Sequence, residues 1–333
     1  MPVLRKIMSL GLLLSGAGAI ASDVEPFALR NQHPVLHVYG LPVFQTAALQ
    51  EHGRSTLRVS LDMANHAERA ENLAESLVLD GESYFLNLSW RRGVKDWLEL
   101  GLDIPLVSHS RGSFDSAIKN WHDIWGLSNS KREGPSDQLQ FLYTVDELPQ
   151  LETYDPVSGI GDIQLSAAVP LGKKTDAGRH PLALRFGVKL PTGDADKLLG
   201  SGGVDGSVGL YTGRTTTLFG RPTGISGFAG VIGLGSGDLL PDRQRDFVPY
   251  GGLAVTWHAS DRFGITGQFQ AQGAYVDSDL DELGGSSIQL AIGGAYRFRG
   301  DGWVLRFALV EDLISDTTPD FGLYVGIGTT SGQ

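Results

Sequence analysis

The chain has 333 residues, no cysteine, 45 glycines and a formal net charge of −11 at neutral pH. The absence of cysteine excludes disulfides, thiol catalysis and lipoprotein acylation, and the acidic balance argues against nucleic acid as a partner. Glycine is about twice as frequent as in an average protein, which is typical of chains that bend strands or bring backbones close together.

Residues 1–21 have the pattern of a secretory signal peptide. Arg5 and Lys6 precede an apolar stretch over residues 7–20, and small residues fit a cleavage site near Ala21. The apolar stretch is too short to span a bilayer as a helix, and no later stretch holds eighteen consecutive apolar residues. We therefore expect export and cleavage, which would leave a mature chain of charge −13.

Residues 22–53 do not resemble a strand, because Pro26, Pro34 and Pro42 interrupt them. We expect an irregular lead segment that lies in the periplasm or is tucked into the mouth of the domain that follows.

From residue 54 to 333, apolar and polar residues alternate in long runs. In the run 262–275, Phe263 and Phe269 fall on one face, whereas Gln268 and Gln270 fall on the other. Soluble sandwiches use shorter strands, and runs of about ten residues or more with aromatic ends are typical of tilted strands that cross a bilayer. The sequence predicts an all-β fold, a closed antiparallel transmembrane β-barrel of about twelve strands, at 56–64, 77–90, 96–107, 160–171, 181–191, 204–215, 224–235, 248–258, 262–275, 286–298, 302–313 and 320–330.

Connection lengths orient this barrel. The tightest connections are Arg91–Lys95, Ala259–Arg262 and Arg299–Gly302, and short turns are expected on the periplasmic side. An even number of strands must lie between the first two of these turns. Residues 138–146 also alternate but would make that number odd, so we assign them to the long outer loop 108–159, as a ribbon above the membrane.

The same outer loop contains one predicted short helix. Ser113 is a suitable N-cap, and an apolar stripe with one histidine beside it follows at helical spacing. The stripe could pack against the barrel lumen, another loop or the lipopolysaccharide interface. Its residues are candidate gate residues: Phe114, Ile118, Trp121, His122 and Trp125.

Charged residues of both signs fall on the inward face of the predicted strands. Such side chains are costly unless they face water or each other. They either cross-link a narrow lumen or line a small pore. The candidates are Arg58, Asp62, Glu99, Asp103, Asp162, Arg185, Lys189, Asp205, Arg297 and Arg306.

Signals for catalysis or a cofactor are weak. His109, Ser110, Ser113 and Asp115 invite a serine-hydrolase interpretation, but no nucleophile elbow is present. The acidic run that begins at Asp277 lacks the glycine and the final glutamate of a calcium loop. We expect no catalytic residues, no metal and no cofactor.

Several segments follow one another in a distinctive order: Arg30–Pro34, Asp80–Glu82, Glu99–Pro105, Ile118–Leu127 and Gly159–Asp162. This order resembles a family of uncharacterised proteobacterial outer-membrane proteins, catalogued as domain of unknown function 3187. Gly159–Asp162 and Leu190–Asp194 are looser matches, and they are also similar to barrels of phenol-degradation pathways, which implies passage of aromatic substrates. The chain departs from outer-membrane barrels in ending without an aromatic residue, so either the assembly signal is internal, at Phe321–Ile327, or assembly is less conventional.

These observations favour a passive channel or transporter in the Gram-negative outer membrane for a small solute, hydrophobic or aromatic ones included. The alternative is a structural or envelope-interaction barrel whose own charges close its lumen, and a third hypothesis is an outer-membrane lipid hydrolase. The expected partners are outer-membrane lipid, lipopolysaccharide, the barrel-assembly machinery and the solute.

Overall fold

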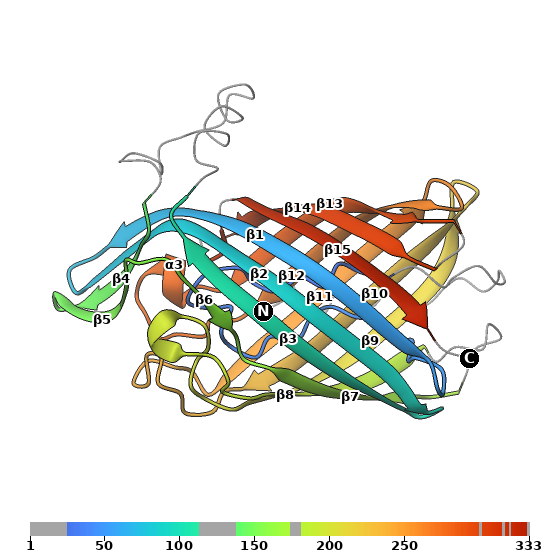
Figure 1. Ribbon diagram of the computed structural model, residues 1–333, viewed down its shortest axis with the longest axis horizontal. Coiled ribbons are helices and arrows are strands. Elements are labelled where there is room, and N and C mark those ends of the chain that lie inside the picture. The colour runs from blue at the N-terminus through green and yellow to red at the C-terminus, as the bar shows by residue number, and fades with distance from the viewer. Residues whose placement is uncertain are drawn as a thin grey trace, which may run out of the picture.

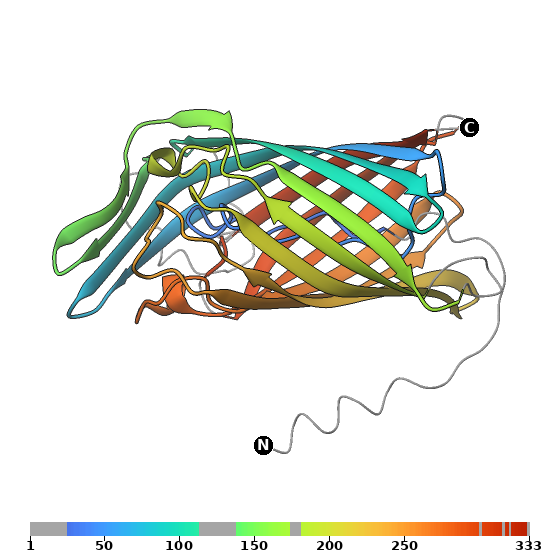
Figure 2. The ribbon, with the colours of Figure 1, turned by 90° about the horizontal axis from the view of Figure 1, so that it is seen from below.

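The chain forms a closed, antiparallel, twelve-stranded β-barrel, as the sequence predicts (Figures 1 and 2). A computed structural model describes residues 25–112, 138–173, 181–299, 302–314, 317–319 and 321–331. The first and last strands pair from Ser55 opposite Ser331 to Asn65 opposite Phe321, and this pairing closes the barrel. Every wall strand therefore has a partner on both sides, which a bilayer requires of a β-structure.

The wall strands are β1 (Ser55–Glu71), β2 (Glu75–Lys95), β3 (Leu98–Ser110), the interrupted strand β6 (Val157–Ile160) and β7 (Gln164–Leu171), β8 (Leu182–Lys189), β9 (Asp205–Leu218), β10 (Arg221–Gly233), β11 (Phe247–His258), β12 (Phe263–Gln272), β13 (Ser287–Arg297), β14 (Val304–Ile314) and β15 (Phe321–Ser331). The two remaining strands, β4 (Gln140–Val145) and β5 (Leu148–Thr153), extend the sheet beyond the wall.

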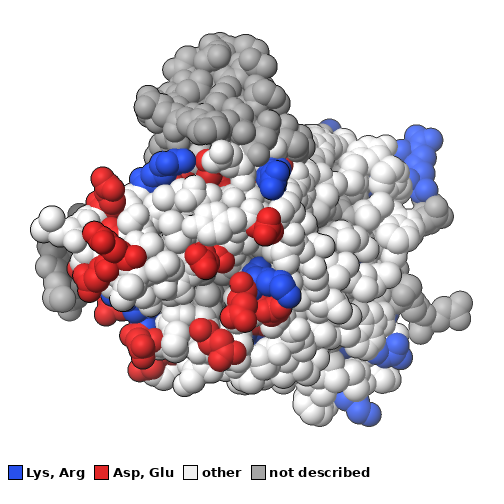
Figure 3. Space-filling model, turned by 60° about the vertical axis from the view of Figure 1, so that its left-hand side comes forward, with Lys and Arg blue, Asp and Glu red and all other residues white. Residues whose placement is uncertain are grey.

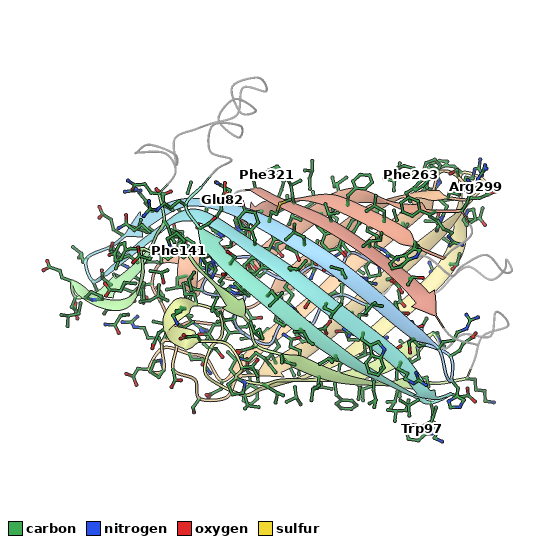
Figure 4. All side chains as sticks on the ribbon, viewed as in Figure 1. Glu82, Trp97, Phe141, Phe263, Arg299 and Phe321 are labelled. Atoms are coloured by element: carbon green, nitrogen blue, oxygen red, sulfur yellow. The ribbon has the colours of Figure 1, made fainter. Side chains whose placement is uncertain are left out.

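The two faces of the wall differ as the alternation predicts. Leu253 and Ile292 point outward and are 62% and 56% exposed, whereas their neighbours Ala254 and Ala291 point inward and are 3% and 2% exposed. Outward aromatic residues gather near one end of the barrel, where Figure 4 shows Trp97 and Phe263. An apolar outer belt with an aromatic rim is the surface that a lipid bilayer covers.

The two ends of the barrel carry different connections. One end, called here the turn end, has the short connections 96–97, 219–220, 259–262 and 298–303. The opposite end, called here the loop end, has the longer connections 111–156, 190–204, 234–246 and 273–286. All three turns predicted to share an end do so, and β1 begins and β15 ends there. The first of them is shorter than predicted, because β2 continues to Lys95.

At the loop end, β1 and β2 run past the wall and form an arm with β4 and β5. Strand β4 pairs with β2 over Glu75–Asp80, beyond the stretch of β1 that pairs with β15. The prediction that residues 138–146 form a ribbon outside the wall is confirmed. The predicted bounds of the first two strands, 56–64 and 77–90, were too short, because both strands continue into the arm and β2 also continues to Lys95 at the turn end. In the arm apolar residues take the inward positions, as Leu77 and Leu79 do where they pack against β4 residues.

Helices are few in the described part of the chain: a 3₁₀ turn, Ala195–Lys197, and α3, Asp281–Gly284. None of the described helices has the length and apolar character to cross a bilayer. The predicted loop helix, with its gate candidates Phe114, Ile118, Trp121, His122 and Trp125, lies outside the described residues.

We expected the lead segment to lie in the periplasm or in the mouth of the barrel, but the structure places it deeper. From Glu25 to Arg54 it runs inside the barrel, where it forms the core together with inward side chains of the wall (Figure 2). Its own apolar residues Phe27, Leu29, Val35, Tyr39 and Phe44 are at most 1% exposed. Residues 25–53 are called the plug below.

Candidate functional site: the plugged lumen

The plug rises from the turn end to the loop end and returns. Glu25 pairs with Arg306 near the start of β14, at the turn end. At the top, the Asn31 side chain donates to the carbonyl of Thr317 in a loop-end connection, at 2.9 Å. The chain turns back over residues 33–38, and near its end His52 bridges to Gly93 at the turn end. Both limbs of the plug therefore fit within one lumen.

Nine of the ten predicted lumen residues point into the lumen and contact either the plug or each other. The tenth, Arg297, lies half-buried at the turn end of β13. The structure brings eight of the nine together in four clusters along the plug, and the ninth, Asp62, contacts the plug separately.

Lys189 is the centre of the first cluster and is 2% exposed. Its ammonium group lies 2.8 Å from a carboxylate oxygen of Asp162 and 3.1 Å from one of Asp205, and it donates to the carbonyl of Val38 in the plug at 3.2 Å. Asp205 in turn accepts from the backbone N–H of Gly40 at 2.9 Å. Lys189 and Asp205 thus bind the backbone of the plug at its return, and Asp162 supplies a second carboxylate to Lys189.

Gly40 shows how closely the plug approaches the wall here. A Cβ atom at residue 40 would lie 3.0 Å from the Cβ of Asp205 and 3.4 Å from that of Lys189. A side chain at this position therefore requires the plug or the wall to shift by a few tenths of an ångström.

The second cluster joins the rising limb to β2 and β3. Asp103 pairs with Arg91 at 2.7 Å and with Arg30 of the plug at 3.9 Å. Arg30 also donates to the side chain of Gln164 at 3.0 Å and to the carbonyl of Leu41 at 3.0 Å. It therefore ties the two limbs of the plug to each other as well as to the wall.

The third cluster holds the returning limb. Arg185 pairs with Glu99 at 2.7 Å and donates to the carbonyl of Thr46 at 3.0 Å. The other oxygen of Glu99 accepts from the backbone N–H of Gln50 at 2.7 Å.

The fourth cluster lies at the turn end. The Glu25 carboxylate pairs with Arg58 and, at 3.1 Å, with Arg306. Higher in the barrel, Asp62 accepts a hydrogen bond from the side chain of Gln32 at 3.0 Å.

The wall opposite the charged clusters is neutral and rich in glutamine. Gln268 accepts from the N–H of Phe27 at 2.8 Å and donates to its carbonyl at 3.0 Å, and Gln270 donates to the carbonyl of Leu29 at 3.2 Å. These amides form hydrogen bonds with backbone N–H and C=O groups of the plug, as a neighbouring strand would. A buried irregular segment needs such partners, because an unpaired buried backbone group is costly.

Little free volume remains beside the plug. Three spaces that it lines have volumes of only about 40, 30 and 40 Å³. Each has room for a few water molecules at most. None of these three spaces could hold an organic solute.

The arm and the loops close the loop end above the plug. Glu75 of the arm accepts hydrogen bonds from the hydroxyl of Tyr143 at 2.9 Å and from the hydroxyl of Ser278 at 2.6 Å, and it pairs with Arg243. Beneath this contact, Tyr39 of the plug stacks on Tyr275 with 5.1 Å between ring centroids. The top of the plug is thus covered.

The hydrolase hypothesis gains nothing from His109. Its ring bonds the Ser83 hydroxyl at 2.8 Å and the Leu198 carbonyl at 3.1 Å, and all of the ring is buried. Ser83 also contacts His66 at 3.0 Å. This chain of polar groups is closed to substrate, and Ser110 is no part of it. Among the described residues no group of three or more histidine, aspartate or glutamate side chains could hold a metal ion.

Sequence reasoning missed Glu25, Arg30 and Arg91. Arg91 continues the inward parity of β2 but was placed in a turn. Arg30 begins the segment Arg30–Pro34, which sequence reasoning treated as distinctive without a location.

The comparisons with known proteins agree with this geometry. The model of a family described as "Protein of unknown function (DUF3187)" matches residues 3–329. The chain belongs to this family. No curated protein matches the DUF3187 chain.

Among solved structures, the DUF3187 barrel resembles the COG4313 outer membrane channel from Pseudomonas putida F1, with a TM-score of 0.55, 13% identity, and coverage of 86% of this chain and 98% of that one. LpxR from Salmonella typhimurium gives a TM-score of 0.41 at 9% identity, over 84% of this chain and 100% of that one. The Ralstonia pickettii toluene transporter TbuX gives 0.34 at 11% identity, over 85% and 90%. The first likeness shows a shared fold, and the other two carry no further argument.

Proposed function

We propose that this protein is an outer-membrane channel for small solutes that rests in a closed state, with the plug as a displaceable gate. The observation that carries the proposal is the way the plug is held. Between residues 25 and 51 its backbone forms no ladder with any wall strand, and side chains hold it instead. The plug can therefore leave while all wall pairings stay intact.

The path of the plug supports the same proposal. Both limbs end at the turn end, so a displacement toward that end needs no threading through the barrel. Contacts between wall side chains and the backbone of the plug are single hydrogen bonds, which contribute about 0.5–1.5 kcal/mol net when the side chain is neutral and about 1.5–3 kcal/mol when it is charged, because water competes for the same groups. Such contacts can be exchanged one at a time.

The proposal includes a location and an orientation. The apolar belt and the fold shared with the COG4313 channel support placement in the Gram-negative outer membrane, in contact with its lipid. The turn end then faces the periplasm and the loop end faces lipopolysaccharide. Export through the signal peptide at residues 1–21 and insertion by the barrel-assembly machinery belong to the same proposal. The solute, hydrophobic or aromatic ones included, is left to experiment.

A second function is a structural barrel whose lumen stays closed. The number of buried ion pairs around the plug favours this function. Departure of the plug would remove one partner from some of these pairs, and a buried charge without its partner is strongly destabilising. Under this alternative the plug is a permanent part of the core.

The two functions are distinguished by locking the plug. The chain has no cysteine, so Gly40→Cys with Asp205→Cys creates one defined pair. The Cβ separation at these positions is a few tenths of an ångström below the usual disulfide range, so a small shift allows the bond.

We expect the wild type to show discrete openings in planar bilayers. In the double variant these openings should vanish on oxidation and return with reductant, whereas each single cysteine variant should ignore both reagents. A wild type that never opens at any voltage would favour the structural barrel. Openings that persist in the oxidised double variant would show that the plug is not the gate.

A further inference from the structure

The Glu25 carboxylate occupies a site formed by two arginines of the wall. Arg58 on β1 and Arg306 on β14 both pair with the same oxygen of Glu25. Burial favours the neutral carboxyl, but the charges of the two guanidinium groups outweigh it and hold the pKa of Glu25 below its usual value. The Arg306 side chain is 5% exposed and that of Arg58 is 12% exposed, whereas Glu25 remains 30% exposed. The Glu25 carboxylate, which occupies the site as a ligand would, is thus the most exposed member of the cluster.

A cavity of about 40 Å³ lies beside this carboxylate. Val43 and Phe44 give it an apolar side, and Thr56, Arg58, Arg91 and Arg185 give it donors. Within the described residues, the hydroxyl of Thr56, which is 9% exposed, and the Nε of Arg58 have no hydrogen-bond partner. A buried donor without a partner is costly, so these two atoms point to a polar occupant of the cavity, such as water or part of a ligand.

The charge of the two barrel ends indicates the side from which such a ligand comes. Figure 3 shows carboxylates gathered over the loop end. The exposed acids of the arm and the loop-end connections include Glu71, Asp146, Glu147, Asp238 and Asp242. Exposed basic residues are frequent at the turn end, among them Arg54, Arg92, Lys95, Lys173 and Arg299. An anion is therefore attracted to the turn end, where Glu25 lies, and repelled at the loop end.

We propose that Arg58 and Arg306 form a binding site for a small organic carboxylate, and that this ligand opens the channel from the turn end by taking the place of Glu25. Its carboxylate pairs with the two arginines, and its apolar body rests on Val43 and Phe44. Glu25 acts as the internal occupant of the site, and its release frees the first residues of the plug. The gating step rests on the proposed function, whereas the binding site does not.

The chemistry of the site selects a carboxylate over its neutral analogue. An amide of the same shape cannot pair with two guanidinium groups and would leave both buried charges without a counter-ion. Because Glu25 is tethered, it competes at an effective concentration in the millimolar range or above. The wild type should therefore respond only to millimolar ligand.

The test uses benzoate, its neutral analogue benzamide and three variants of the full mature chain. In planar bilayers, benzoate on the turn-end side should raise the open fraction of the wild type, and benzamide should not. Glu25→Gln should open without ligand. Arg58→Gln should remove the response to benzoate. Glu51→Gln is the matched control, since Glu51 is an exposed acid of the plug that pairs with Arg54 at 3.4 Å.

Equilibrium binding of radiolabelled benzoate to the detergent-purified barrel gives a readout that needs no conductance. Glu25→Gln should bind at least about ten-fold more tightly than the wild type and Glu51→Gln, because the tethered competitor is gone. Equal binding of benzoate and benzamide, or equal affinity of Glu25→Gln and Glu51→Gln, would overturn the site. Selective binding without any channel opening would support the site and defeat the proposed channel. Channel openings that benzoate does not change would support the proposed channel and overturn the binding site.

Discussion

Lys189→Met should be among the most destabilising single substitutions in the lumen. The ammonium group balances Asp162 and Asp205, which are both buried, and methionine keeps its length and removes its charge. Removing one partner of a buried ion pair costs about 3–5 kcal/mol. We expect a loss of about 3–5 kcal/mol in the free energy of unfolding.

The loss can be measured by denaturant titration of the barrel in lipid vesicles, with heat-modifiable gel mobility as a second probe of folding. Lys197→Met is the matched control, because Lys197 pairs with Asp194 at 2.6 Å but is 57% exposed. An exposed pair contributes little to stability, so this variant should lose far less than Lys189→Met. Adding Asp205→Asn should recover part of the loss caused by Lys189→Met, since only one buried carboxylate then remains. If both lysine variants lose the same small amount, the cluster is hydrated and our account of it is wrong.

Two further predictions concern the belt and the top of the plug. Leu253 on the belt and Leu148 at the tip of the arm are 62% and 65% exposed, so they differ mainly in whether lipid surrounds them. Leu253→Arg should cost about 2–4 kcal/mol and Leu148→Arg less than about 0.5 kcal/mol in vesicle-based unfolding, and equal costs would contradict the bilayer placement. Burial lowers the pKa of His33 to about 3, so the stabilisation of the docked plug is complete above pH 6.5 and is lost as the pH falls toward 3. Between pH 7 and pH 5 the loss is about 2 kcal/mol, to be measured by denaturant titration in lipid vesicles, and a stability that His33→Gln leaves equally dependent on pH would refute this account.

The barrel could be predicted from the sequence because one face of each strand meets lipid and the other meets the lumen. The difference is visible between neighbouring residues: Ile292 and Leu253 face lipid, whereas Ala291 and Ala254 face the lumen. The alternation of inward and outward positions also located the inward charges, since Lys189 and Arg185 can be assigned to the lumen without knowing what they contact. Parity failed in the arm, where the sheet leaves the bilayer and both of its faces can meet protein.

The plug could not be predicted, because its contacts join residues far apart in the chain and follow no period. The prolines at 26, 34 and 42 excluded a strand but gave no location. Arg30 pairs with Asp103, and Gln268 binds the backbone of Phe27, 241 residues away. Such pairs become visible only when the barrel closes around the segment. The tight turn assigned to Arg91–Lys95 also hid Arg91, whose partner Asp103 had already been placed in the lumen.

The clusters along the plug also change what the lumen charges mean. A pore lining would present its charges to water, but here Lys189, Asp205, Arg185 and Glu99 each bond backbone groups of the plug. Their arrangement is therefore explained by the closed state alone, without reference to a permeant. If the plug leaves, the wall keeps its internal pairs, such as Lys189 with Asp162, but the Arg58 and Arg306 pair loses its only described carboxylate. The turn-end cluster is thus the one whose balance depends on the plug, and it is where a ligand can decide between the closed and the open barrel.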